Sequence, residues 1–487
     1  MPNTTSPRRQ RRVLAAAAAT TAAVLSAGVL GGAATAHDGD PHDGTAYTPP
    51  PVVDAGPVTG SFRNTPASAR HEVWLVDQSD TRRDGDAAAN VFASYGGTVH
   101  VYDGADLRRD ATTAPAERVD LGGATAALCR ASTGANPVRP HMLSFSPDDS
   151  HAILAFVTSG HVVVFDAAAR EPVACFRTEP GAGGARQAHA ALPTPDGRYV
   201  LVANQNGKKL ERIRTDYAAG VFTQEPEATL DLTAGTTPNG MPMQTPGDPT
   251  VRPDNAPICP FVPSTGYPAF VSLRGGGLFA VDPYAERLRV VAEYPATEVA
   301  RDGCGFTEAA GWVYGNGGSN PGNLSGWFQY RLPVGEAGTY SAANPPSMPA
   351  VDVVDHDTRG PRDAHGVATV ARKYVWAFDR AAHVVQVYDA STAETVVTVN
   401  LRTAGSQRPA PDIADVSPDG RAVYASTRGP NPLTGTHAAV GDAPGVLVLE
   451  AGLDGRTPAV RGHAGISNVV AGVERADPHG LAVRVIR

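Results

Sequence analysis

Potential metal ligands occupy one recurrent position in this sequence, six residues ahead of a tight turn. Pro147 lies six residues after His141, and Pro195 lies six residues after His189. Weaker copies keep this offset without the proline, and the strand that ends the chain supplies a last member. The seven residues at this position are His141, His189, Cys259, Cys304, His365, Asp412 and His479.

All seven side chains belong to types that bind transition metals. Only 14 histidines occur in 487 residues, so four histidines at seven equivalent positions are hard to assign to chance. Imidazole ligands suit copper or zinc, and a carboxylate can complete such a site. We therefore predict one transition metal as the cofactor. The predicted ligands are His141, His189, His365, His479 and Asp412.

Internal repeats place these residues in the fold. The segments "HMLSFSPDDSHAILAFVTSG", "HAALPTPDGRYVLVAN" and "DIADVSPDGRAVYAS" each combine a short strand, a Pro-Asp turn and a second strand. Proline presets φ, aspartate bonds its own backbone and glycine accepts positive φ. Three weaker units begin at Cys259, Cys304 and His365, so six units follow one another along the chain.

Segments near the two ends complete a further unit. "EVWLVDQSD", "GTVHVYDGADL" and "ERVDLGG" read as second, third and fourth strands, and "HGLAVRVIR" at the C-terminus reads as the missing first strand. We predict an all-β fold: a seven-bladed β-propeller over residues 71–487, with its first blade completed by the C-terminal strand (velcro closure). Closure removes two open sheet edges. The innermost strands would then bring the seven ring positions together at one end of the channel.

The units "SPDGRAVYAS" and "PDGRYVLVAN", with "VYDA" at a strand end, resemble those of the YVTN-type repeat propellers. These propellers are related in fold to the lactonase-type propellers, and the resemblance covers roughly residues 71–487. It implies a propeller fold, whereas this superfamily supports many functions. Lactonase-type enzymes hold a metal at the channel mouth largely through acids and amides. This sequence has mostly histidine there, so no catalytic residue is carried over.

Charged residues just ahead of the ring positions are predicted to support the ligands. A carboxylate that accepts a hydrogen bond from a ligating imidazole fixes the tautomer of that imidazole. The supporting candidates are Asp363, Asp477, Arg139, Arg186 and Arg362. Arg428, in the Pro/Gly-rich loop "STRGPNPLTG", is predicted to face a ligand at the rim of the channel.

Two other interpretations of the ring stay open. Cys259 and Cys304 stand at equivalent places in adjacent blades, so we expect them to form a disulfide rather than to bind metal. Cys129 and Cys175, which flank the second blade, would then form the other disulfide. Alternatively, the polar residues of the channel bind only water and one another.

The N-terminus predicts an export signal. Residues 1–36 have a basic start, an apolar middle and an A-x-A cleavage site at Ala34–Ala36. Arg11 and Arg12 resemble the twin-arginine export motif. Cleavage removes four arginines and no acid, which takes the formal net charge from −8 to −12, and leaves a flexible segment over residues 37–70. The protein is expected to be secreted or held in the cell envelope.

An acidic exported protein is a poor nucleic-acid binder. No segment after the signal is apolar for long enough to span a bilayer. We expect a monomer that binds a small-molecule or protein ligand at a propeller face, with the metal site at the channel mouth. Whether it is an enzyme stays open. The alternatives are a non-catalytic recognition or scaffold propeller of the cell envelope and a lactonase-type hydrolase.

Overall fold

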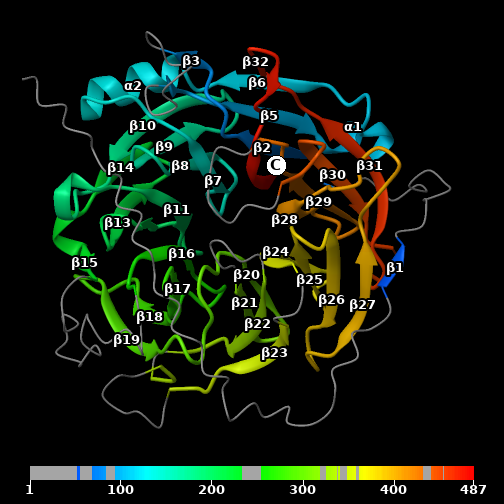
Figure 1. Ribbon diagram of the computed structural model, residues 1–487. Helices are drawn as coiled ribbons and strands as arrows, with labels where there is room; N and C mark the ends of the chain where they lie inside the picture. The colour runs from blue at the N-terminus through cyan, green and yellow to red at the C-terminus, as the bar shows by residue number, and fades with distance from the viewer. Residues whose placement is uncertain are drawn as a thin grey trace, which may run out of the picture. The chain divides into compact units, whose positions relative to one another are not determined.

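A computed structural model describes residues 52–54, 69–83, 94–232, 254–318, 325–336, 338–340, 348–357, 361–431, 440–452 and 454–486. Contacts divide the chain into Met1–Thr48 and Pro49–Arg487, and all the described residues belong to the second unit. The predicted export signal therefore lies outside the described residues. Part of the segment predicted to be flexible forms β1 (Val52–Asp54), which pairs in parallel with β27 (Thr395–Asn400) (Figure 1).

The Ser/Thr-Pro-Asp units fold as predicted into tight turns between antiparallel strands. Ser146 Oγ donates to Asp148 Oδ1 at 2.6 Å, and the same bond recurs between Thr194 and Asp196 at 2.6 Å. The residue after each aspartate has positive φ: Asp149 has φ 61° and the equivalent glycine, Gly197, has φ 71°. The repeated sequence thus produces a repeated strand–turn–strand geometry.

The first three antiparallel sheets order their strands in the same way. One contains β34 (Pro478–Val485), β2 (His71–Asp77), β5 (Thr98–Asp103) and β6 (Ala116–Asp120). The next contains β7 (Pro140–Phe145), β8 (His151–Phe156), β9 (His161–Asp166) and β10 (Glu171–Arg177). The third contains β11 (Ala188–Pro193), β12 (Tyr199–Asn204), β13 (Lys209–Asp216), β14 (Val221–Gln224) and β15 (Leu230–Asp231).

The remaining large sheets continue this order. One contains β16 (Pro257–Phe261), β17 (Ala269–Leu273), β18 (Leu278–Asp282) and β19 (Arg289–Tyr294). A parallel bridge between β22 and β24 joins the next two groups. These are β20 (Phe306–Ala309), β21 (Trp312–Gly317), β22 (Ser325–Pro333) and β23 (Asp352–Asp357), then β24 (Arg362–Val370), β25 (Tyr374–Asp379), β26 (Val384–Asp389) and β27. The last sheet contains β28 (Pro411–Val416), β29 (Ala422–Thr427), β30 (Gly445–Glu450) and β31 (Ala459–Gly465).

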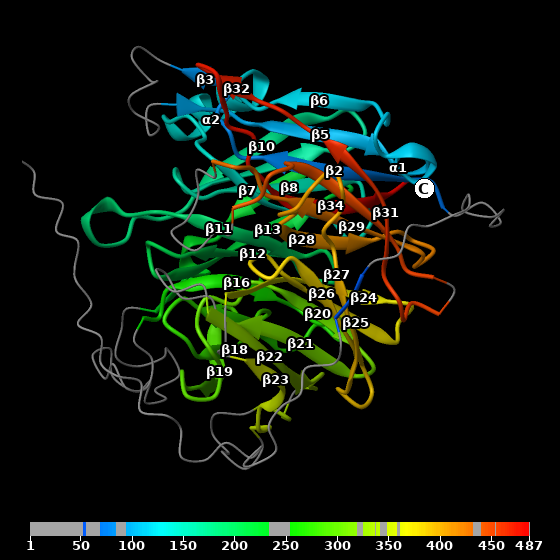
Figure 2. The same cartoon turned by 45° about the vertical axis from the view of Figure 1, so that its right-hand side comes forward.

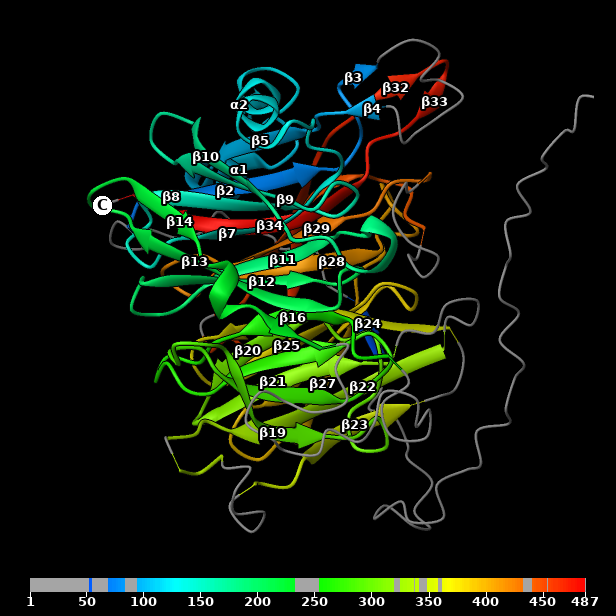
Figure 3. The same ribbon diagram turned by 90° about the vertical axis from the view of Figure 1, so that its left-hand side faces the viewer.

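Short elements lie between these sheets. Two small hairpins pair β3 (Arg82–Arg83) with β4 (Ser94–Tyr95) and β32 (Val469–Val470) with β33 (Val473–Glu474). The helices are α1 (Gly104–Asp110), α2 (Ala124–Thr133) and 3-10 turns at Ala182–Gly184 and Pro226–Ala228. Figure 3 shows α2 beside β10, which it contacts. No helix among the described residues is long and apolar enough to cross a membrane.

The innermost strands contact one another in chain order. β34 contacts β7, β7 contacts β11, and β11 contacts β16. Farther along the chain, β20 contacts β24, β24 contacts β28, and β28 contacts β34. Figure 1 shows these strands facing a common centre within the unit 49–487. β34 pairs with β2 in antiparallel register, with Leu481 opposite Leu75 (Figure 2). The all-β prediction is therefore confirmed, whereas the number of blades stays a prediction.

Both predicted disulfides are present. Cys129 of α2 is bonded to Cys175 of β10, and Cys259 of β16 is bonded to Cys304, which lies just ahead of β20. The first bond ties a helix to a sheet, and the second ties β16 to the segment ahead of β20. Disulfides persist in oxidising compartments, so the two bonds are typical of a protein outside the cytoplasm.

Apolar side chains of neighbouring sheets pack face to face to form the core. Trp74 of β2, Leu154 of β8 and Phe165 of β9 belong to one such cluster, and all three are buried. Burial of a leucine or phenylalanine side chain contributes about 1.5–3 kcal/mol to folding. Packing between sheets therefore fixes the positions of the inner strands.

Replacing Leu154 by alanine should lower the free energy of unfolding by roughly 2–5 kcal/mol, because the lost side chain leaves a cavity. Val173→Ala is the control, since Val173 of β10 is 45% exposed and its truncation should cost less than about 0.5 kcal/mol. Urea denaturation followed by circular dichroism measures both values. Equal losses for the two variants would contradict this description of the core.

Candidate metal centre

The ring positions lie on the innermost strands and separate into two groups. In each group the possible ligand atoms lie within 4.8 Å of one another. The first group is His189 on β11, Cys259 on β16 and Cys304, and the second is His365 on β24, Asp412 on β28 and His479 on β34. His141 on β7 lies between them: its ring stacks on His479 at 3.8 Å between centroids and meets the ring of His189 edge-on at 4.6 Å.

A β-bulge coincides with the ring position in most of these strands. The antiparallel register shifts between Pro140 and Leu143, and this shift spans His141. Shifts at the same place span His189, Cys259, His365, Asp412 and His479 in their own sheets. A bulge leaves its extra residue unpaired and re-aims that side chain. The bulges thus turn the ring side chains toward the channel.

Glycine next to a ring residue lets neighbouring inner strands approach closely. A Cβ at Gly480 would lie 2.2 Å from the carbonyl oxygen of His141, and a Cβ at Gly366 would lie 2.0 Å from that of Asp412. Real Cβ atoms do not come this close to backbone, so other residues would push the strands apart. These glycines let the ring residues of adjacent sheets lie close together.

Two of the ring histidines have one nitrogen fixed and the other unpartnered. His141 Nδ1 donates to Gln78 Oε1 at 2.8 Å, and His479 Nδ1 donates to Asp412 Oδ2 at 2.6 Å. Because both acceptors are oxygens, each Nδ1 carries a proton, and Nε2 offers its lone pair when the imidazole is neutral. The Nε2 atoms of both residues are buried and have no hydrogen-bond partner within the described part of the chain.

Four basic side chains surround the carboxylate of Asp412. Its Oδ1 lies 3.0 Å from Arg380 and 3.3 Å from His365 Nε2, and its Oδ2 lies 3.1 Å from Arg428 and 2.6 Å from His479. Burial acts to raise the pKa of Asp412, but these four neighbours outweigh it and hold the pKa well below its ordinary value. Asp412 is therefore a carboxylate that orients histidine, with both oxygens already engaged.

Asp412 is the middle member of a row of alternating charges, the charge ladder, which consists of Asp363, Arg380, Asp412, Arg428 and Asp477. Arg380 lies 2.8 Å from Asp363 on its other side, and Arg428 lies 2.7 Å from Asp477. All five side chains are at most 2% exposed. The ladder holds three carboxylates and two guanidinium groups, so it has one excess negative charge. A buried excess charge is costly unless a proton or a cation balances it.

Burial also keeps His141 neutral. It lowers the pKa of His141 well below the ordinary value, and the nearby His479, His189 and Arg428 lower it further. The imidazole is therefore uncharged at neutral pH, and Nε2 can donate its lone pair to a metal.

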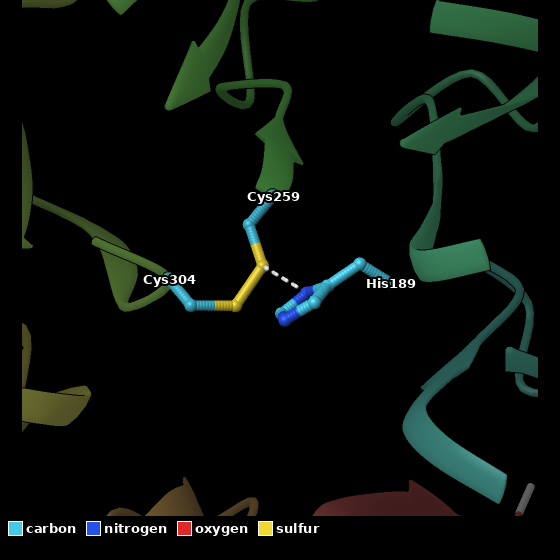
Figure 4. A group of neighbouring side chains, drawn as sticks. All are labelled: His189, Cys259 and Cys304. Carbon is cyan, nitrogen blue, oxygen red and sulfur yellow. Dashed lines mark hydrogen bonds between the residues drawn. A yellow bond between two sulfur atoms is a disulfide. The ribbon is translucent and has the colours of Figure 1, made fainter. Parts of the chain in front are cut away.

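The first group contains a disulfide instead of thiolates. Figure 4 shows His189 beside the Cys259–Cys304 bond, with Nδ1 at 3.8 Å from the Cys259 sulfur. The open question of whether these cysteines are ligands or a disulfide is thus answered in favour of the disulfide. Because a disulfide sulfur has no thiolate charge, the oxidised pair offers no strong ligand.

Asp363 and Asp477, the aspartates predicted to support ring histidines, form hydrogen bonds with arginine side chains. Asp363 accepts two hydrogen bonds from Arg380, and Asp477 accepts one from Arg428. The carboxylate that accepts from His479 is Asp412 itself. Burial lowers the pKa of Arg139, while the charge of Asp477 acts to raise it, so this arginine lies within the electrostatic field of the ladder.

Arg186 and Arg362 make their bonds elsewhere. Arg186 donates to the carbonyl oxygen of Thr178 at 2.7 Å, and Arg362 pairs with Asp357 at 3.0 Å and with Asp379. These bonds fix loops and strand ends around the inner strands. They give no support to the prediction that the two arginines orient ring histidines.

The prediction that Arg428 faces a ligand at the rim is wrong. The side chain is 2% exposed and spans Asp412 and Asp477. Arg428 directly follows β29, whose end reaches the channel, so its guanidinium group turns inward to the buried carboxylates. The Pro/Gly-rich sequence after it suggested an exposed loop.

Sequence reasoning missed Arg380 and Gln78, although a repeat signal marks them. Gln78, Arg380 and Arg428 each directly follow the second strand of a sheet, in "VWLVDQ", "VWAFDR" and "VYASTR". The backbone N–H of each donates to the chain two residues ahead of a ring residue: to the carbonyl oxygens of Asp477, Asp363 and Ala410. This equivalent position forms a second ring behind the ligands.

The sequence matches no family model and no curated protein. Solved structures with a similar fold include a candidate 6-phosphogluconolactonase from Bacteroides fragilis, 11% identical with a TM-score of 0.52 over 86% of this chain and 99% of that one. Another is the periplasmic gluconolactonase of Pseudomonas aeruginosa, 13% identical with a TM-score of 0.50 over 86% of this chain and 100% of that one. At this identity the similarity shows the fold alone: the chain is a β-propeller like those of lactonase-type proteins.

Proposed function

We propose that this β-propeller binds a transition metal ion, copper or zinc, on its channel axis through the Nε2 atoms of His141 and His479, with His365 as a third ligand. The observation that carries the proposal is the pair of buried, unpartnered Nε2 atoms. Metal-binding histidines generally donate their other N–H to a carboxylate or carbonyl oxygen, and both residues do so, to Gln78 and Asp412.

The charge of the centre supports a cation. The buried ladder around Asp412 has one more carboxylate than guanidinium groups, and Arg139 with Asp80 adds one charge of each sign nearby. A metal ion would neutralise the excess charge without placing a proton on a buried histidine. Asp412 is better suited to orient His479 than to bind the ion, because its oxygens are already paired with Arg380, Arg428 and His479.

The ligand types favour zinc or copper over harder ions. Magnesium and calcium prefer oxygen ligands, whereas imidazole nitrogen suits zinc and copper. Three protein ligands leave a further coordination position for water or another molecule. When bound, such an ion would act as a Lewis acid toward that molecule or would be held for release.

His141→Ala combined with His479→Ala should abolish binding of zinc and copper, because it removes both unpartnered nitrogens. His161→Ala is the matched control: His161 is also buried, but its two ring nitrogens bond to Ser159 and Thr133. Mass spectrometry of the metal in the purified protein, followed by zinc and copper titration, measures the result. If the unsubstituted protein neither carries nor takes up either metal, the proposal is wrong.

Asp412→Asn should weaken metal binding by about 10–100-fold, as loss of an orienting carboxylate does at other metal sites. The amide keeps the shape of the side chain but removes the charge that fixes the His479 tautomer. Asp282→Asn is the control, since Asp282 pairs with Arg289, which is half exposed and lies on another sheet. Competition titration with a chelator gives both affinities, and unchanged affinity in Asp412→Asn would exclude this role of Asp412.

Lactone hydrolysis is a second candidate function, and the two lactonase-named structures of similar fold favour it. In this case a metal ion would polarise the lactone carbonyl, and water would open the ring to the hydroxy acid. Titration of the acid released from glucono-δ-lactone tests the idea. We expect hydrolysis faster than in buffer and its loss in Asp412→Ala, and a rate equal to buffer would remove this candidate.

A further inference from the structure

The two disulfides lie in different chemical surroundings. Cys129 and Cys175 belong to an apolar cluster that contains Trp74 and Phe156. Cys259 and Cys304 also pack in an apolar cluster, but they lie beside His189, and the three possible ligand atoms are within 4.8 Å of one another. Among the described residues, this disulfide is the one placed next to an imidazole at metal-site distances (Figure 4).

We propose that reduction of the Cys259–Cys304 disulfide creates a second metal site, formed by the two thiolates and His189. The site is separate from the one at His141, His365 and His479, and the inference does not depend on that site binding metal. Two thiolates and one imidazole form a soft ligand set that suits zinc or copper(I). A fourth position stays open to water or to a neighbouring side chain.

A dithiol can supply the two electrons that reduce the Cys259–Cys304 disulfide. One thiolate of the dithiol attacks a sulfur of the Cys259–Cys304 bond and forms a mixed disulfide, and its second thiolate then displaces the protein sulfur. The protein disulfide gains two electrons and two protons, and the reductant becomes a disulfide. Binding of a divalent metal then releases the two thiol protons, because the ligands are thiolates.

The backbone around the cysteines is held by bonds other than the disulfide. Ser272 on β17 accepts a hydrogen bond from the Cys259 N–H at 3.3 Å and donates to the carbonyl oxygen of Gly303 at 2.5 Å. Gly305 N–H donates to the side chain of Asn316 at 3.0 Å. These bonds flank both cysteines, so the sulfurs stay close together after reduction, and the site needs little rearrangement.

His189 is held in place from the other side. Its ring meets that of His141 edge-on at 4.6 Å, and Nδ1 points toward the Cys259 sulfur at 3.8 Å. A metal placed between this nitrogen and the two sulfurs would shorten these contacts to bonding distances of about 2.0–2.3 Å. The three ligand atoms already lie within 4.8 Å of one another, so a small movement would bring them to these distances.

Cobalt(II) tests the proposal, because thiolate-bound cobalt has an intense charge-transfer absorption that imidazole-bound cobalt lacks. The protein is reduced with dithiothreitol, freed of reductant under nitrogen and titrated with cobalt. Cys129→Ser/Cys175→Ser keeps the channel disulfide and should show the absorption after reduction, with about one thiolate-bound cobalt per chain. Cys259→Ser/Cys304→Ser keeps the other disulfide and should not show it.

Two further variants separate this site from the one of the proposed function. His365→Ala/His479→Ala should keep the charge-transfer absorption in the reduced protein, even if the histidine site is lost. His189→Gln retains all four cysteines and should weaken thiolate-bound cobalt by at least about tenfold, because loss of even a residue that only orients a ligand costs about 10–100-fold. This variant also provides a test if a cysteine variant fails to fold.

Three outcomes would overturn the proposal: no charge-transfer absorption in reduced Cys129→Ser/Cys175→Ser, the same absorption in reduced Cys259→Ser/Cys304→Ser, or unchanged cobalt affinity in His189→Gln. A thiol count after reduction confirms in each sample that the disulfide has opened. Absence of metal at the histidine site, by contrast, would leave the second site intact.

Discussion

The buried carboxylate of Asp412 is the constraint on which the centre depends. A single charge at this depth would be unstable without partners, and the fold surrounds it with two guanidinium groups and two imidazoles from different sheets. Each partner can reach it only if its own strand lies at the channel. The same contacts that stabilise the charge therefore fix Arg380, Arg428 and His479 in one arrangement.

Backbone features bring these groups together. Bulges at the ring positions turn the side chains inward, and glycines such as Gly366 and Gly480 let the next inner strand lie against the bulge. Neither the bulges nor the glycines supply a ligand atom. A continuous pleat would send alternate side chains into the sheet interfaces, and a larger residue than glycine would separate the histidines. The ligand geometry is thus a property of the repeat as much as of the ligands.

Much of the fold is predictable from the sequence, because the Pro-Asp turns of three units, and the weaker turns at the same offset, mark the end of each first strand. The shared offset from these turns identified the inner-strand residues, from His141 to His479, and the equivalent positions of Cys259 and Cys304 indicated their disulfide. The pattern of the first strands does not predict Arg380 or the burial of Arg428, because both arginines follow second strands. Whether a side chain at a strand end turns inward depends on charges from other sheets, which a single repeat does not contain.

The centre has two chemically different sides, and His141 connects them. On one side, the buried imidazoles offer nitrogen atoms, and the carboxylate of Asp412 orients one of them. On the other side, the sulfur atoms form a disulfide beside His189, and they become thiolates only after a two-electron reduction. The ring of His141 contacts a histidine of each group. An oxidised protein would therefore present one ligand set, and a reduced protein two adjoining ones, so the redox state of its compartment would set its metal capacity.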